Sequence, residues 1–138
     1  DPKNPYSGVI SIFIDRLLQN KPVTVNGGYQ TRDFIYVKDI VNTLLCSMES
    51  ISCDQCCDFI NLGTGKSITI DNLLEIIAGI LKVKPNKFIK KLLIGDPEIS
   101  SGTYDKIQKI SGIDISTFRT LDEGLLETIE YIKKDFLS

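Results

Sequence analysis

The sequence predicts an α/β fold in which short strands alternate with helices, and two observations support this prediction. In several separate segments, apolar residues recur at the three- and four-residue spacing of a helix face. Between these segments stand short β-branched or apolar runs that are closed by glycine, as strands often are. The alternation favours the α/β class, and 138 residues with 42% hydrophobic and 25% charged residues fit one domain over residues 1–138.

Three elements are predicted in the first part of the chain. Residues 9–20 follow a proline and glycine break and carry apolar side chains at helical spacing, which predicts a helix. Residues 23–25 are a β-type run and predict a short strand. Asn26, Gly27 and Gly28 then predict a sharp turn, because glycine tolerates a positive φ.

The middle of the chain is predicted to form two strands and a helix between them. Residues 32–37 are rich in side chains that favour strands. Asp39 is a suitable N-cap for a helix whose apolar stripe ends near Met48. The apolar run 57–62, which glycines close, predicts a strand buried in a sheet.

The next two predicted elements are a third helix and an edge strand. Thr69 is a suitable N-cap for an apolar segment that stops before Pro85, because proline cannot continue a helix. Residues 87–92 alternate lysine with apolar residues and predict an edge strand, since lysines discourage pairing between exposed edges.

Two more helices are predicted near the C-terminal end from local signals. Residues 105–111 form a short helical pattern that Gly112 closes. Thr120 and Glu123 form a capping box, in which a hydroxyl and a carboxylate three residues apart bind each other's backbone N–H groups. The helix that they open is predicted to reach about residue 135.

The composition argues against nucleic acid and membrane as partners. The formal net charge is −2 and the basic residues are scattered among acids, so no basic field would attract a phosphate backbone. No apolar run approaches the roughly 20 residues that cross a bilayer, and no signal pattern opens the chain. We expect a cytoplasmic protein and, because the sequence does not begin with methionine, a piece of a longer chain.

The four cysteines are expected to be reduced thiols without a metal. Cys53 and Cys56 have the spacing of half a zinc site, but the chain has no histidine, and zinc usually needs four ligands. Cys57 directly follows Cys56, and neighbouring side chains cannot easily point at one ion. Cys46 lies apart from the other three, and nothing indicates the oxidising compartment that disulfides require.

A glycine-rich turn at residues 63–67 looks like a phosphate-binding loop but lacks its first glycine. The sequence Gly-Thr-Gly-Lys-Ser matches the end of a P-loop, yet Ile60 stands where the motif begins. A dinucleotide fingerprint fails as well, because Ile68 stands where a third glycine would be. We interpret the segment as a turn between a strand and a helix.

The chain shows no catalytic centre of its own. It has no histidine for general acid–base chemistry. None of its five tyrosines is followed four residues later by a lysine, the spacing that would let an ammonium lower the pKa of a phenol.

Three motifs, in order, resemble extended short-chain dehydrogenases that act on nucleotide sugars, of the UDP-glucose 4-epimerase type in the NAD-dependent epimerase/dehydratase family. They are Asp1-Pro-Lys-Asn-Pro-Tyr-Ser-Gly-Val-Ile-Ser-Ile-Phe13, Gln30-Thr-Arg-Asp-Phe-Ile-Tyr-Val-Lys-Asp39 and Phe59-Ile-Asn-Leu-Gly-Thr-Gly65. Gly95-Asp96 and the helix start at residues 120–125 fit the C-terminal end of the family, so the resemblance covers nearly the whole chain.

The resemblance implies a two-part enzyme of which this chain is the C-terminal, substrate-binding lobe. An N-terminal Rossmann domain would hold NAD and carry the Tyr-x-x-x-Lys pair, and the full-length protein would be a homodimer. The chain would bind the UDP moiety of a UDP-hexose and would be inactive alone. The alternative is a non-catalytic or degenerate module that binds a nucleotide sugar without turnover.

The resemblance also implies which residues bind the substrate. Arg32 matches the clamp of the diphosphate, and a guanidinium suits this role because it forks onto two phosphate oxygens. A surface ion pair of Arg32 with Asp33 or another acid is the alternative. The other implied positions line the nucleotide, although Phe34 fits a core position equally well. They are Thr24 and Asn26 beside the base, Ser7, Gly8 and Val9 at the helix start, and Phe34.

One position departs from the family pattern. The family usually has arginine two residues before the Gly-Asp pair, as a second phosphate ligand, and here Leu93 stands in its place. Asp96 is implied to reach a ribose hydroxyl, and Lys90 or Lys91 is a possible partial replacement for the charge. Losing one charge-assisted contact is expected to weaken nucleotide binding by roughly 1.5–3 kcal/mol.

The chain alone is also expected to expose surface that a neighbouring domain would cover. Much of the predicted helix over residues 39–48 belongs to this surface. We therefore predict that the chain alone is marginally stable, self-associates, or is held by contacts that the full-length protein lacks.

Overall fold

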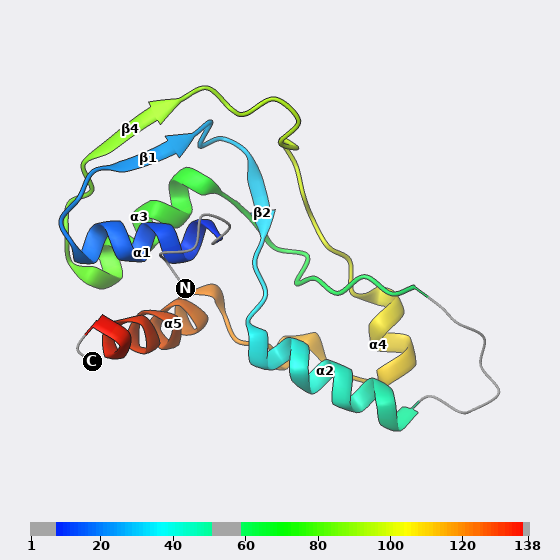
Figure 1. The fold of residues 1–138 in the computed structure, drawn as a ribbon. Coiled ribbons are helices and arrows are strands. Elements are labelled where there is room, and N and C mark those ends of the chain that lie inside the picture. Colours follow the sequence, from blue (N-terminus) through cyan, green and yellow to red (C-terminus); the bar gives the residue numbers. More distant parts are fainter. Residues whose placement is uncertain (1–7, 51–58, 137–138) are drawn as a thin grey trace.

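The computed structural model describes residues 8–50 and 59–136, and it confirms the α/β class. Figure 1 shows two parts, which we call the lobe and the arm. The lobe contains helices α1, α3 and α5 and strands β1 and β4, whereas the arm contains helices α2 and α4. Strands β2 and β3 lie where the lobe meets the arm.

The lobe is built around three helices and a small parallel sheet. Helices α1 (Val9–Leu18), α3 (Ile70–Leu81) and α5 (Leu121–Phe136) contact one another. Strands β1 (Val23–Asn26) and β4 (Lys87–Lys90) pair in parallel, so the strand predicted over 87–92 is confirmed for its first four residues. Their shared core is apolar. Its most deeply buried members are Phe13, Ile14, Val23, Val25, Leu73, Leu74, Ile77, Ala78, Leu125 and Ile129.

A second sheet joins distant parts of the chain. Strand β2 (Thr31–Asp33) pairs antiparallel with β3 (Ser67–Thr69), and Arg32 lies opposite Ile68. On the other side of β2, the N–H of Thr31 donates to the carbonyl of Glu98 at 2.8 Å, and the N–H of Ser100 donates to the carbonyl of Thr31 at 3.1 Å. Strand β2 is therefore held from both sides.

The arm exposes a large apolar surface. Helix α2 (Val37–Ser50) packs on α4 (Asp105–Ser111), and the 3-10 helix η1 (Ile115–Thr117) leads back to the lobe. The exposed face of α2 carries Val41, Leu44, Leu45 and Met48, and Met48 is 74% exposed. We call these four residues the α2 apolar face. The prediction that this helix would be exposed is confirmed.

Local sequence signals placed most helix ends correctly. Thr69 caps α3 by accepting a hydrogen bond from the N–H of Asn72, and Gly112 closes α4 with a φ of 66°. The capping box is also confirmed, because the Glu123 carboxylate accepts from the N–H of Thr120 at 2.8 Å. These signals act between residues close in sequence, so they need no knowledge of the tertiary fold.

Three predictions were wrong in part. Residues 59–62 form no strand, because nothing in the described chain pairs with them; residues 57 and 58 lie outside the described part. The predicted strand over 32–37 stops at Asp33, where its three-residue partner β3 ends. Helix α2 begins at Val37, so Asp39 lies in its first turn, 4% exposed, and binds Arg119 rather than capping the helix.

Candidate functional site

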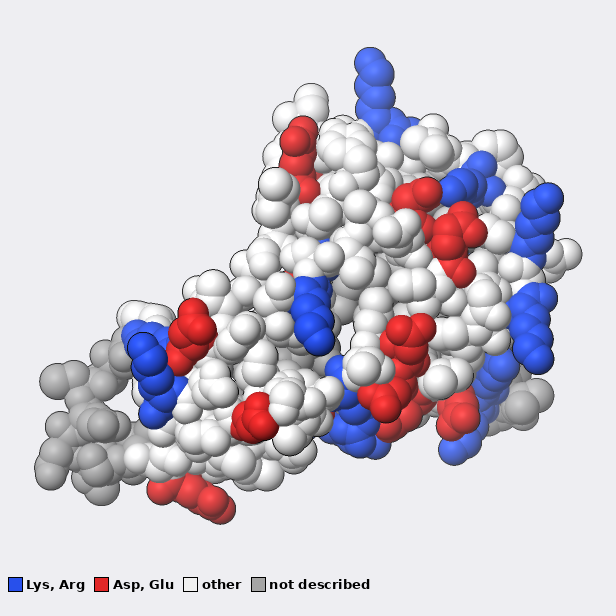
Figure 2. Space-filling view, turned by 180° about the vertical axis from the view of Figure 1, so that it is seen from behind, with Lys and Arg blue, Asp and Glu red and all other residues white. Residues whose placement is uncertain are grey.

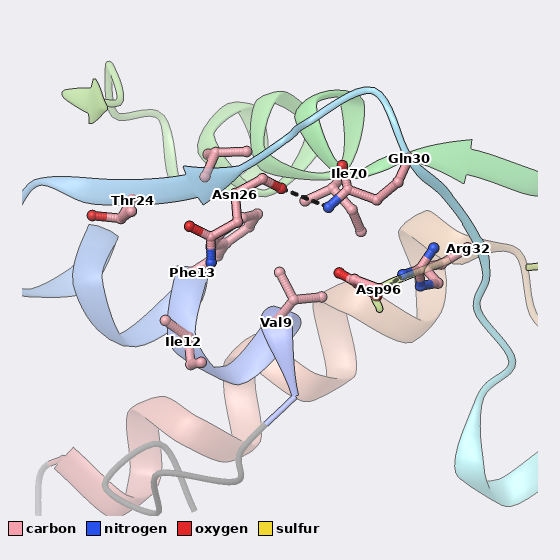
Figure 3. Close-up of a pocket in the computed structure, with 10 residues that line it drawn as sticks. Val9, Ile12, Phe13, Thr24, Asn26, Gln30, Arg32, Ile70 and Asp96 are labelled. Atoms are coloured by element: carbon pink, nitrogen blue, oxygen red, sulfur yellow. Dashed lines mark hydrogen bonds and ion pairs between the residues drawn. The ribbon is translucent and has the colours of Figure 1, made fainter. Parts of the chain in front are cut away.

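A cavity of about 300 Å³ lies between the start of α1, strand β1 and the end of β2 (Figure 3). It brings together five of the residues that the sequence implicated. Arg32 and Asp96 lie close together in Figure 3, while Thr24 and Asn26 project from β1 and Val9 from α1. Ile12, Phe13, Val25, Gln30 and Ile70 complete the lining.

Arg32 is oriented by three hydrogen bonds. Its Nη1 donates to the backbone carbonyls of Thr31 and Pro97, each at 2.8 Å, and its Nη2 donates to Oδ1 of Asp96 at 2.5 Å. The ion pair is therefore with Asp96 and not with Asp33. A guanidinium carries five N–H donors, so donors remain for a ligand. The side chain is 21% exposed, which leaves it reachable from solvent.

Strand β1 and Gln30 form another part of the cavity wall, and sequence reasoning did not single out Gln30. Gln30 is 5% exposed, and its Nε2 donates to the carbonyl of Asn26 at 2.6 Å. Its Oε1 has no hydrogen-bond partner among the described residues. A Cβ on Gly27, where φ is 74°, would lie 2.7 Å from this oxygen, so a side chain at this position would be strained. The signal was present, because Gln30 opens the motif that contains Arg32.

Two implicated positions among the described residues, Gly8 and Phe34, lie outside the cavity lining. Gly8 is the N-cap residue of α1 and is exposed, and Ser7 lies outside the described residues. Phe34 packs against the apolar core and lines two other cavities, because the chain leaves β2 after Asp33 and turns this side chain inward. Leu93 is exposed and does not line the cavity.

The glycine-rich turn at residues 63–65 binds a carboxylate of the chain itself. Oδ2 of Asp33 accepts from the N–H of Thr64 at 2.9 Å and from the N–H of Gly65 at 2.8 Å. It also accepts from the N–H of Gly102 at 3.2 Å, and the Thr64 hydroxyl donates to Oδ1. We call Asp33, Thr64, Gly65 and Gly102 the Asp33 junction. These N–H groups are not free to cradle a phosphate, so the turn does not fit the pyrophosphate of NAD.

A second polar group, which we call the Arg119 cluster, joins the start of α2 to α5. It consists of Arg119, Tyr36, Lys38, Asp39 and Glu127. Nε of Arg119 donates to Glu127 at 2.8 Å, its Nη1 lies 3.2 Å from Oδ1 of Asp39, and its guanidinium carbon lies 4.9 Å from the centroid of the Tyr36 ring. Hydrogen bonds from Lys38 and Tyr36, together with Arg119, lower the pKa of Glu127 to about 2. This cluster borders other cavities than that of Arg32.

No metal-binding group of three or more candidate ligands occurs among residues 8–50 and 59–136. Cys46 is a free, half-buried thiol in α2, whereas Cys53, Cys56 and Cys57 lie outside the described residues. Within the same ranges, none of the helices combines the length and apolarity needed to span a membrane. Figure 2 shows charged side chains of both signs interspersed over the lobe.

Comparison with known proteins places the chain in a family. A model of the NAD-dependent epimerase/dehydratase family matches residues 1–63. A putative UDP-glucose 4-epimerase of Methanocaldococcus jannaschii is 30% identical over 136 residues, which are 98% of this chain and 42% of the relative. The chain therefore spans less than half the length of this relative.

Solved structures agree with this placement. The UDP-glucose 4-epimerase of Thermotoga maritima, determined with UDP-glucose, matches with a TM-score of 0.87 and 31% identity over 99% of this chain and 42% of that one. The UDP-N-acetylglucosamine 4-epimerase of Methanobrevibacter ruminantium, determined with UDP-N-acetylmuramic acid, matches with a TM-score of 0.83 and 33% identity over 98% of this chain and 42% of that one. The fold is thus that of extended short-chain dehydrogenases. The chain belongs to the NAD-dependent epimerase/dehydratase family.

Proposed function

We propose that this whole chain is the nucleotide-sugar-binding part of an NAD-dependent epimerase and that its cavity binds the UDP moiety of a UDP-hexose. The observation that carries the proposal is the cavity between β1 and Arg32. Arg32 would bind the diphosphate, and the strand containing Thr24 and Asn26 would lie beside the base. The solved relatives that contain UDP-sugars support this assignment.

The charged residues at the cavity form an ion pair with which an anionic ligand must compete. Arg32 and Asp96 are the charged residues among those that line it, and they neutralise each other. A diphosphate is strongly anionic, so it competes with Asp96 for the guanidinium. Arg32 can still bind the diphosphate, because its remaining N–H donors lie in the plane of a permanently charged guanidinium. Leu93 contributes no charge here.

In this proposal NAD is bound mainly by a domain outside the chain. The sequence has no complete dinucleotide fingerprint, and the Asp33 carboxylate already binds the turn that resembles one. When bound, NAD would accept a hydride from the sugar and return it. The contribution of this chain is to hold the nucleotide so that the hexose faces the NAD-binding domain. We therefore propose that the chain is inactive alone. We also propose that the full-length protein is a cytoplasmic homodimer.

A second candidate is a module that binds a nucleotide sugar without turnover. Leu93 favours it, since the position lacks the arginine expected from the family pattern. Calorimetric titration of the intact gene product with UDP and UDP-glucose, paired with a turnover assay, separates the two functions. Binding with conversion supports the epimerase, and binding without conversion supports the module.

The proposal is tested by Arg32→Ala in the intact gene product. We expect KM for the UDP-hexose to rise about 10- to 150-fold, because one charge-assisted contact of roughly 1.5–3 kcal/mol is lost. Steady-state kinetics measure the change. Arg16→Ala is the matched control, since Arg16 is exposed on α1 away from the cavity lining. Unaltered kinetics in Arg32→Ala would contradict the proposed role.

A further inference from the structure

We propose that Asp33 is a positioning residue that fixes the orientation of Arg32 without contacting the ligand. The inference rests on the proposed function, because it concerns the same diphosphate site. Asp33 does not line the cavity, yet it follows Arg32 directly in β2. Its carboxylate binds two segments that are remote in sequence, at residues 64–65 and at residue 102.

The segment that Asp33 binds at Gly102 is the same one that orients Arg32. Residues 96–102 run beside β2, and three successive residues of β2 hold them. Arg32 donates to Asp96 and Pro97 at one end. Thr31 exchanges backbone hydrogen bonds with Glu98 and Ser100 in the middle. Asp33 accepts from Gly102 at the other end, so its carboxylate anchors the segment that supplies two acceptors to Arg32.

Two glycines make this arrangement possible. A Cβ built on Gly63 would lie 2.5 Å from the Cα of Gly102, and one built on Gly102 would lie 2.6 Å from the Cα of Gly63. Any side chain at either position would push the two segments apart. With glycine at both positions, one carboxylate reaches the N–H groups of both segments. The glycine-rich turn therefore serves the Asp33 junction, which explains a motif that phosphate binding does not.

The junction is matched to a charged carboxylate. Asp33 accepts from three backbone N–H groups and from the Thr64 hydroxyl. Asparagine has nearly the same shape, but it carries no charge, and an amide nitrogen in place of Oδ1 would face the N–H of Thr64, which lies 3.2 Å from that atom. Asp33→Asn therefore weakens the junction and loosens the Gly102 end of residues 96–102, which Thr31 and Arg32 still hold to β2. Arg32 then loses the fixed position of its acceptors, while β1 and Gln30 at the base end keep their contacts.

The test compares UDP with uridine in the intact protein by titration calorimetry. Uridine lacks the diphosphate, so its binding does not depend on Arg32. We expect Asp33→Asn to weaken UDP binding about tenfold, as for one lost charge-assisted contact, and to leave uridine binding unchanged. In an Arg32→Ala background, Asp33→Asn is expected to add nothing, because it acts through Arg32. Asp114→Asn is the matched control, since Asp114 also accepts two local hydrogen bonds but lies outside the cavity lining.

The possible outcomes separate the inference from the proposed function. Equal weakening of UDP and uridine, or a full additional loss in the Arg32→Ala background, overturns the positioning role and leaves the proposed function intact. Failure of the wild-type protein to bind UDP overturns both. If circular dichroism shows that Asp33→Asn does not fold, Thr64→Val replaces it in the test, because it removes only the Thr64 hydroxyl, which donates to Asp33 and accepts from the N–H of Lys66. It should weaken UDP about threefold and spare uridine, and an equal loss for both ligands overturns the inference.

Discussion

At the scale of single residues, Arg32 shows how neighbours prepare a side chain for binding. Three hydrogen bonds fix its guanidinium before any ligand arrives. A fixed side chain loses less conformational entropy when it binds, so preorganisation favours affinity. Asp96 acts in the opposite direction, because it neutralises the charge that a diphosphate would seek. The affinity of the site therefore depends on the balance between orientation and charge.

A charge added at position 93 should shift this balance. We expect Leu93→Arg to tighten UDP binding about tenfold or more, since it restores the second cation that the family pattern places there. Titration calorimetry on the intact protein measures the change. Ile94→Arg adds the same charge at the next, fully exposed position and is expected to change the affinity by no more than about twofold. Equal effects of both variants would show that only the general charge matters.

At the scale of elements, the Arg119 cluster determines how α5 meets the start of α2. Asp39 accepts from the N–H of Arg119 at 2.9 Å, and Tyr36 donates to Glu127 at 2.6 Å. The side chain of Asp39 is buried, and a buried carboxylate is costly unless it is paired. This need for a partner fixes the segment before α5 against α2. The capping box of Thr120 then begins α5 immediately after Arg119.

The low pKa of Glu127 predicts how stability depends on pH. Its pKa is about 2 in the folded protein, below the ordinary 4.5. The charged form is therefore favoured by folding, and the stability it adds is present above about pH 4.5 and is lost as the pH falls toward 2. We expect the difference in Tm between wild type and Glu127→Gln to shrink over this range. Thermal melts at a series of pH values measure it.

The matched control for this prediction is Glu130→Gln. Glu130 is exposed on the same helix and has no part in the Arg119 cluster. Its removal should change Tm by a similar small amount at every pH in the range. A constant difference in Tm between wild type and Glu127→Gln would contradict the role assigned to the cluster.

At the scale of the whole molecule, the arm presents apolar surface that the lobe does not cover. In Figure 1, α2 and α4 extend away from the three helices of the lobe. The α2 apolar face is exposed, and contiguous apolar surface of this kind usually contacts another domain or molecule. Under the proposed function, the NAD-binding domain would cover it in the full-length protein. Expressed alone, the chain is expected to use this face to associate with itself.

Charged substitutions on this face should prevent the self-association. We expect the 138-residue chain to form dimers or larger species, and Leu44→Lys with Met48→Lys to shift it toward monomer, because lysine at an apolar contact must give up its hydration. Sedimentation velocity at several concentrations measures the distribution. Leu126→Lys, at a partly exposed position on α5, is the control and should leave it unchanged. A monomeric wild-type chain with a sharp, concentration-independent melt would contradict this prediction.

Much of the fold followed from short-range patterns. Thr69, Gly112 and the pair of Thr120 and Glu123 mark helix ends through contacts within a few residues, so their effect is readable from the sequence. The β-type run from Val23 to Val25 likewise predicted the strand that the structure shows as β1. The motif containing Arg32 directed attention to the residue that now lies in the cavity, and resemblance to a family supplied the reason to single it out.

The remaining features depend on contacts between residues far apart in the chain. Arg32 pairs with Asp96 rather than with the adjacent Asp33, and Asp39 binds Arg119 instead of capping its own helix. Residues 59–62 look like a strand, but a strand exists only where another pairs with it, and the described chain offers none. Local propensity thus placed the helices and the main strands. The partner of each charged side chain was settled only when folding brought distant segments together, because electrostatic and hydrogen-bond energies depend on distance in space.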